Sequence, residues 1–85
     1  MLFLILSVLE DDQRKLVEDI FKNNYKKYLR ISTRILGSNT VAEEAVSDAL
    51  IKISLNIKRI SHLPCPEMEA FCVTIVKNCA YDHLR

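Results

Sequence analysis

The stretch TVAEEAVSDALIKISLNIKR, residues 40–59, has an unusually clear helix start. Thr40 followed by Glu43 fits the capping box, in which each side chain satisfies a backbone amide of the other residue, so we expect a helix from Val41 to about Arg59. At roughly 100° per residue, small and aliphatic side chains cluster on one side of this helix, which is the expected core face. The core face consists of Ala42, Val46, Ala49, Leu50, Ile53 and Ile57.

The opposite side of the same helix carries a second stripe, which is acidic at one end and apolar at the other. A domain of this size rarely leaves two large aliphatic side chains beside two acids in water, so the stripe indicates a docking surface for a partner helix. A second interpretation stays open, in which Ile51 and Leu55 are covered by a short helix at the N-terminus. We call this set the docking stripe; it consists of Glu44, Asp48, Ile51 and Leu55.

Length and composition restrict the fold to one domain of helices. The 85 residues suffice for a single core. The chain has 49% hydrophobic residues, which is too apolar for a disordered chain. It has only one Gly and two Pro, which is too few turn residues for a many-stranded sheet. We expect an all-α fold, a compact bundle of three main helices plus a short N-terminal helix, that spans residues 1–85. The net charge of +1 confines any contact with nucleic acid to a local surface or to one shared with a partner.

A long helix is predicted between Asp11 and Leu36. It begins near Asp11 or Asp12, whose carboxylates suit a helix N-terminus, and it ends before Gly37. Apolar side chains and one amide recur at steps of three and four residues, which indicates one buried face. This face consists of Val17, Phe21, Asn24, Tyr28, Ile31 and Ile35.

Another face of the same helix carries four basic residues, one at every fourth position. Such a row fits a solvated surface, and it also fits electrostatic contacts with the phosphates of a nucleic acid. The sequence leaves both interpretations open. We call this set the basic row; it consists of Lys22, Lys26, Arg30 and Arg34.

The run from Met1 to Leu9 is almost wholly apolar. It lacks a basic leading region and a small-residue cleavage site, acids follow from Glu10, and it is far shorter than the roughly 20 residues that span a bilayer. We therefore predict a short helix that packs onto the bundle, in a cytoplasmic protein with no membrane partner.

The three cysteines are odd in number, form no CxxC motif and have no paired histidines nearby. They are typical of small buried hydrophobic residues in a reducing compartment, and a metal site is the less favoured interpretation. We expect no metal ion and no cofactor. The three are Cys65, Cys72 and Cys79.

A final helix is predicted from Glu67 to Arg85, after a loop from Ile60 to Cys65. Pro66 suits its first turn, where no amide hydrogen bond is lost. The side expected to pack on the core consists of Met68, Phe71, Cys72, Ile75 and Cys79. An adjoining side offers phosphate contacts, base-edge hydrogen bonds and stacking, although a solvated face would have the same pattern. We call it the mixed face; it consists of Thr74, Lys77, Asn78, Tyr81 and Arg85.

Two runs, in this order, resemble region 2 of the sigma-seventy family of bacterial RNA polymerase sigma factors. The first is VAEEAVSDALIKI from Val41, and the second is FCVTIVKNCAYDHLR from Phe71. The nearest class is that of the small, extracytoplasmic-function-like factors, and the likeness covers nearly the whole chain. Ser47 and Leu50 depart from the family pattern, which usually has Gln and an aromatic residue at these positions.

The resemblance implies a transcription initiation factor domain that docks on core RNA polymerase and recognises and opens the minus-ten promoter element. In that family the helix matching Val41 to Arg59 docks on the clamp helices of the largest polymerase subunit. The loop from Lys58 to Pro66 and the final helix match the part that captures unpaired, non-template bases. The implied polymerase-binding residues are Glu44, Asp48, Ile51 and Leu55. The implied DNA-binding residues are Lys58, Arg59, His62, Thr74, Lys77, Asn78, Tyr81 and Arg85.

Two further residues lie at the border between the core side and the polar side of the final helix. We expect Asn78 and Asp82 chiefly to orient neighbouring helices by hydrogen bonds, with direct base contact as the second role. An anti-sigma factor is a further candidate partner, which the sequence does not identify.

A rival function is that of a polymerase-binding regulator or interaction module with a sigma-like fold but no promoter recognition. An enzyme is not expected, because His62 and His83 lack a paired nucleophile or a carboxylate at useful spacing and no phosphate-binding glycine loop is present. Members of the family normally continue into a helix-turn-helix domain that binds the minus-thirty-five element. Since this sequence stops at Arg85, we expect either a cut-out domain or a short gene.

Overall fold

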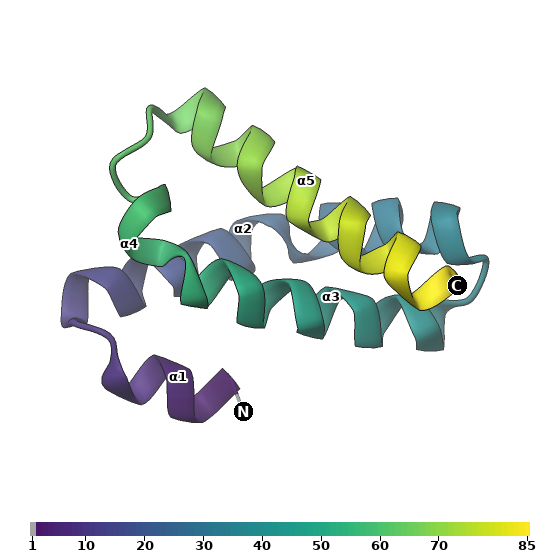
Figure 1. Cartoon of the computed structure of the whole chain (residues 1–85), viewed down its shortest axis with the longest axis horizontal. Helices are drawn as coiled ribbons and strands as arrows, with labels where there is room; N and C mark the ends of the chain where they lie inside the picture. Colours follow the sequence, from purple (N-terminus) through teal and green to yellow (C-terminus); the bar gives the residue numbers. More distant parts are fainter. Residues whose placement is uncertain (1) are drawn as a thin grey trace.

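Five helices make up the computed structural model, which describes the backbone of residues 2–85 and the side chains of residues 4–85. They are α1 (Leu2–Val8), α2 (Asp11–Leu36), α3 (Asn39–Leu55), α4 (Ile57–Ile60) and α5 (Cys65–Leu84). No strand occurs in residues 2–85. The helices α2, α3 and α5 pack against one another in all three pairings, and α1 lies against α3 (Figure 1). The expected all-α bundle of three main helices plus a short N-terminal helix is confirmed.

The apolar N-terminal run forms α1, apart from Met1, which lies outside the described residues. Leu6 and Leu9 are partly buried against the core. Arg14 of α2 donates from Nε to the Leu6 carbonyl oxygen (3.0 Å) and from an Nη to the Leu9 carbonyl oxygen (3.2 Å). The arginine thereby ties the start of α2 to the end of α1, where the Leu6 carbonyl oxygen also accepts from the Leu9 amide (3.3 Å). None of the helices in residues 2–85 is long and apolar enough to cross a membrane.

The bounds of α2 agree with the expected ones, and Gly37 ends it in the left-handed conformation (φ 73°), where its amide donates to the Thr33 carbonyl oxygen (2.7 Å). The buried face is wider than the predicted stripe, because α2 packs on both α3 and α5. Val17 and Tyr28 are buried as expected. Ile20 and Ser32, which were not predicted, are buried as well. The other members of the stripe are only half-buried: Phe21, Asn24, Ile31 and Ile35.

The start of α3 differs from the predicted one. Ser38 is the N-cap, and its Oγ accepts from the Val41 amide (3.4 Å), so the capping box expected for Thr40 and Glu43 is wrong. Because Gly37 turns the chain out of α2, the next residue already has the extended backbone of a cap (φ −138°, ψ 128°). Thr40 consequently lies inside the first turn.

The helix predicted to run to Arg59 is interrupted at Asn56, which separates α3 from α4. Asn56 leaves helical geometry (φ −104°, ψ 9°), and its Nδ2 donates to the Lys52 carbonyl oxygen (2.7 Å). An asparagine amide competes with backbone donors for such a carbonyl, which favours a helix end. After the break, α4 buries Ile57 and Ile60 in the core.

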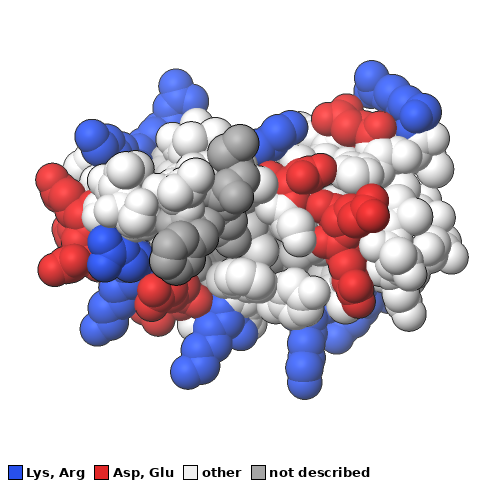
Figure 2. All heavy atoms as spheres, turned by 90° about the horizontal axis from the view of Figure 1, so that it is seen from below, with Lys and Arg blue, Asp and Glu red and all other residues white. Residues whose placement is uncertain are grey.

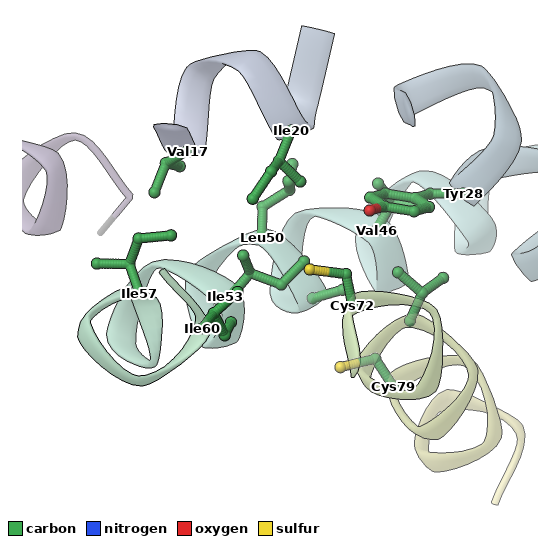
Figure 3. Close-up of a cluster of buried hydrophobic side chains, with 12 residues drawn as sticks. Val17, Ile20, Tyr28, Val46, Leu50, Ile53, Ile57, Ile60, Cys72 and Cys79 are labelled. Atoms are coloured by element: carbon green, nitrogen blue, oxygen red, sulfur yellow. The ribbon is translucent and has the colours of Figure 1, made fainter. Parts of the chain in front are cut away.

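Side chains from α2, α3, α4 and α5 point toward one another in a single core (Figure 3). All six residues of the predicted α3 core face are buried. Tyr28 is 1% exposed at the seam between α2 and α5. Burial raises the pKa of its phenol, and the neighbouring Cys72 raises that pKa further. An ion pair between Lys27 and Glu69 joins the same two helices at the surface.

The last helix begins at Cys65, two residues before the expected start, and Pro66 lies in its first turn as predicted. Cys65 is exposed, so the expectation that all three cysteines are buried is wrong for this one. Cys72 and Cys79 are buried, together with two residues of the same helix that the sequence did not indicate, Val76 and Ala80.

Candidate functional site

The docking stripe lies on the outer side of α3. Glu44 and Asp48 are exposed, and Ile51 is half-buried. Leu55 is 67% exposed although α1 packs on α3, so the interpretation in which the N-terminal helix covers it is wrong. A large aliphatic side chain in this position remains accessible to a partner.

An open groove of about 410 Å³ separates the outer side of α3 from the end of α5. Three of the four docking-stripe residues line it, and Glu44 does not. We call it the α3/α5 groove; its lining residues are Asp48, Ile51, Lys52, Leu55, Cys79, Asp82 and His83. The structure therefore places the stripe directly beside the C-terminal part of the final helix, a neighbourhood that the spacing of the sequence does not show.

Two polar bridges cross this groove. His83 Nε2 lies 2.6 Å from Asp48 Oδ2, and Lys52 Nζ lies 3.9 Å from Asp82 Oδ2. Asp48 and Lys52 are one turn apart on α3, and their two partners are adjacent on α5. Both bridges are solvent-accessible, so each contributes little to stability on its own. Their effect is on the relative position of the two helices.

The expectation that His83 has no carboxylate at useful spacing is wrong, since the fold brings Asp48 to it from α3. The groove also contains a thiol, but burial raises the pKa of Cys79, which keeps its thiol in the neutral, weakly nucleophilic form. The cluster thus has a histidine and a carboxylate without an activated nucleophile.

The cationic residues predicted to face DNA at the loop are all exposed: Lys58 and Arg59 on α4, and His62 in the turn that follows. Lys58 and His62 line a second hollow, of about 400 Å³, that is closed on its other side by the beginning of α2. Glu10 and Asp12 are among its remaining residues. Arg59 does not line this hollow. The acids at the start of α2 are therefore neighbours of the loop, which sequence reasoning missed because they are far away along the chain.

The mixed face of α5 is exposed along its whole length, as the helical period predicts. Tyr81 is 48% exposed and offers much of its ring to solvent. The Thr74 hydroxyl donates to the Ala70 carbonyl oxygen of its own helix (2.9 Å), so it is available to a ligand chiefly as an acceptor.

The two residues expected to orient neighbouring helices differ in the structure. Asp82 forms an ion pair with Lys52 of α3 at 3.9 Å, which is too long for the expected hydrogen bond. Asn78 is exposed, and within the described side chains it makes no hydrogen bond to another helix. The expected orienting role is therefore wrong for Asn78, whose amide is free to contact a ligand.

Charge is distributed unevenly over the face that contains α3. Figure 2 shows acidic side chains gathered over α3, with basic side chains projecting around the edge of this face. The exposed acids of α3 are Glu43, Glu44 and Asp48. A partner with a basic surface would complement this cluster.

Lys52 and His83 are the site residues that sequence reasoning missed. The sequence does contain a complementary pattern, Asp48 and Lys52 on one helix against His83 and Asp82 on another. The pattern becomes informative only when the two helices are known to be neighbours, because complementary charges are common on helix surfaces.

Comparison with known proteins gives one family, described as Sigma-70 region 2, which matches residues 20–85. Neither the curated proteins nor the solved structures contain a match. The family match covers most of the chain, including the docking stripe, the loop cations and the mixed face. It begins within α2 and continues through α3, α4 and α5. The chain therefore belongs to the sigma-70 region 2 family.

Proposed function

We propose that this chain docks on core RNA polymerase through α3 and recognises and opens the minus-ten promoter element through the loop after α4 and the mixed face of α5. The family acts in polymerase binding and promoter recognition in general. The clamp helices of the largest subunit are the proposed docking partner, single-stranded minus-ten DNA is the proposed ligand, and the cytoplasm is the proposed compartment. An anti-sigma factor that covers the docking stripe is a further proposed partner.

The observation that supports this proposal most is the α3/α5 groove. Docking-stripe residues and the end of the DNA-facing helix share its walls, and the bridges from Asp48 to His83 and from Lys52 to Asp82 connect them. A partner that binds α3 would thus hold α5 in a defined pose. This arrangement suits a domain whose affinity for DNA depends on polymerase.

The proposed mechanism is binding, with no covalent bond made or broken. Unpairing and flipping a base costs a few kcal/mol, which contacts with the unpaired strand must offset. The mixed face and its neighbouring loop provide an aromatic ring at Tyr81 for stacking and cations at Lys77 and Lys58 for phosphates. These contacts favour the unpaired state of the strand.

Leu55 offers a test of docking that leaves the fold intact. Leu55→Asp places a charge in the apolar part of the docking stripe at a largely exposed position, so we expect loss of co-purification with core polymerase. Val8→Asp is the matched control, because Val8 lies on α1 away from the groove and is 81% exposed. This substitution also replaces an exposed aliphatic side chain by a carboxylate. Equal retention of polymerase by both variants would contradict the proposed docking surface.

The double variant Lys77→Ala, Tyr81→Ala separates a sigma factor from a regulator that lacks promoter recognition. We expect it to co-purify with core polymerase while its complex no longer captures a labelled single-stranded minus-ten oligonucleotide. The control is Lys15→Ala, which removes an exposed cation from the N-terminal part of α2. Undiminished capture of the oligonucleotide by the double variant would favour the regulator.

A further inference from the structure

The segment from Ile20 to Ala42 concentrates positive charge in a protein that is almost neutral as a whole. It contains five basic residues and no acidic one, whereas the complete chain has twelve against eleven. Lys27 is turned toward α5, where it pairs with Glu69. The other four form the basic row, are exposed, and take part in no ion pair among the described side chains.

The basic row follows the side of α2 that faces away from the core. At 1.5 Å per residue, the distance from Lys22 to Arg34 along the helix is about 18 Å, or about five base pairs at 3.4 Å each. Because the row belongs to a 26-residue helix that is packed on two others, the backbone positions that carry its cations are fixed relative to one another. Distant acidic residues make the chain almost neutral as a whole. They do not cancel the positive field of the basic row at close range.

A shallow hollow of about 340 Å³ lies along the second half of the row. Carbon atoms make up most of the exposed surface of this hollow, but five of its six lining residues carry charged or neutral hydrogen-bond donors. Asn39 Oδ1 lies 3.2 Å from the Thr33 hydroxyl, so the amide nitrogen of Asn39 can donate to a bound anion. The lining residues are Lys26, Leu29, Arg30, Thr33, Arg34 and Asn39.

We propose that the basic row binds the backbone phosphates of duplex DNA without regard to sequence. Lysine, arginine, threonine and asparagine side chains are the groups that contact phosphates in protein–DNA complexes. The hollow contains no aromatic ring for stacking on unpaired bases, which separates it from single-strand sites. Leu29 is the one apolar residue in its lining, so it offers a single aliphatic side chain and no aromatic anchor to a protein partner.

This second surface differs in kind from the proposed minus-ten site, and it needs neither promoter sequence nor polymerase. It would hold the domain weakly on any duplex, in the range of non-specific binding. The promoter-dependent contacts of α5 would then act on DNA that is already nearby. Failure of the minus-ten proposal would leave this inference standing, since the two surfaces lie on different helices.

The test is the salt dependence of binding to a fluorescently labelled duplex without promoter sequence, measured by anisotropy from about 50 to about 200 mM salt. The variant is Lys26→Gln, Arg30→Gln, Arg34→Gln. Each lost phosphate contact reduces the slope of log K against log salt by about 0.9. Between the two ends of this salt range, the triple variant should therefore lose about 40-fold less affinity than the wild type loses. The matched control is Lys15→Gln, because Lys15 is exposed on the same helix but lies among acids.

Circular dichroism of the triple variant checks that it is folded, and Arg30→Lys, which keeps the charge, should retain the wild-type slope. The proposal is overturned if the wild type does not bind the duplex at the low end of this salt range, or if the triple variant keeps the full slope. It is also overturned if Lys15→Gln lowers the slope by as much per charge removed as the triple variant does.

Discussion

The basic row of α2 and the mixed face of α5 are both exposed sides of long helices in one bundle. They differ in their residue types and in the contacts that position their helices. The basic row consists of cations alone, on the back of a helix whose pose is set by core packing. The mixed face adds a hydroxyl, an amide and an aromatic ring to its two cations, on a helix that polar bridges connect to the docking stripe. The first surface suits a ligand of uniform charge, and the second suits one whose bases must be contacted individually.

The difference teaches that exposure and charge do not by themselves distinguish the two roles. The neighbouring elements do, because the mixed face adjoins the α3/α5 groove whereas the basic row has no partner helix in front of it. Under the two proposals, a domain with this arrangement would separate sequence-independent attraction from promoter contacts that depend on docking.

The largest expected effect removes both surfaces together. Ile53→Ala deletes part of a fully buried side chain where α2, α3 and α5 meet, and such substitutions cost about 2–5 kcal/mol. A domain of this length has only a few kcal/mol of net stability, so we expect most of the protein to unfold. Urea unfolding followed by circular dichroism measures the change.

Leu55→Ala is the matched control for this substitution, because it truncates a large aliphatic residue two positions away that is exposed. Its expected effect on the free energy of unfolding is within about 0.5 kcal/mol. Similar destabilisation by both variants would show that Leu55 is packed as closely as Ile53, which would contradict its exposed position.

The next largest effect distinguishes the two surfaces. Tyr81→Ala removes the exposed ring of the mixed face, and loss of base stacking costs about 1–3 kcal/mol per base in single-strand binding. We expect weaker capture of a single-stranded minus-ten oligonucleotide by the polymerase complex, with the salt slope of duplex binding unchanged. Tyr81→Phe, which keeps the ring, should bind as the wild type does. A fall in duplex binding of the same size would remove the distinction between the surfaces.

Much of the fold follows from local sequence signals. Every residue predicted for the core face of residues 40–59 is buried, because small and aliphatic residues repeat there at helical spacing, although the prediction missed Ala45 and Ser54. The end of α2 was predicted because Gly37 adopts the left-handed conformation, which other residues rarely do. The predicted start of α3 was wrong because Ser38 and Thr40 are both good caps, and only the exit of the chain from α2 selects between them.

The candidate site was less predictable, since its geometry depends on contacts between distant segments. The exposure of the mixed face follows from the period of one helix. The approach of His83 to Asp48 does not, because it depends on how α3 and α5 pack. The break at Asn56 was also missed, since asparagine is tolerated inside helices and ends them only when its side chain binds a nearby carbonyl.

A smaller effect concerns the seam that joins α5 to the rest of the bundle. Burial raises the pKa of the Cys72 and Cys79 thiols, so the folded protein keeps protons that the unfolded chain releases above its ordinary thiol pKa of about 8.5. Stability is therefore complete below that pH and is lost as the pH rises through the folded-state pKa values. The expected loss is up to about 1.4 kcal/mol per pH unit for each thiol.

Urea unfolding between about pH 8 and pH 10 tests this pH dependence. Cys72→Ala should reduce the slope, and Cys65→Ala, at the exposed cysteine, should leave it unchanged. An equal slope in the two variants would contradict a role for the buried thiol.

The smallest expected effect on stability concerns the bridge between His83 and Asp48. His83→Ala should lower the free energy of unfolding by less than about 1 kcal/mol, because the carboxylate is solvent-exposed. It should nevertheless weaken capture of the single-stranded oligonucleotide by the polymerase complex, since it removes one of the two bridges that connect α5 to α3. The basic row should keep its duplex affinity. A double-mutant cycle with Asp48→Ala measures the coupling in oligonucleotide capture, and a coupling of zero would show that this bridge does not set the pose of α5.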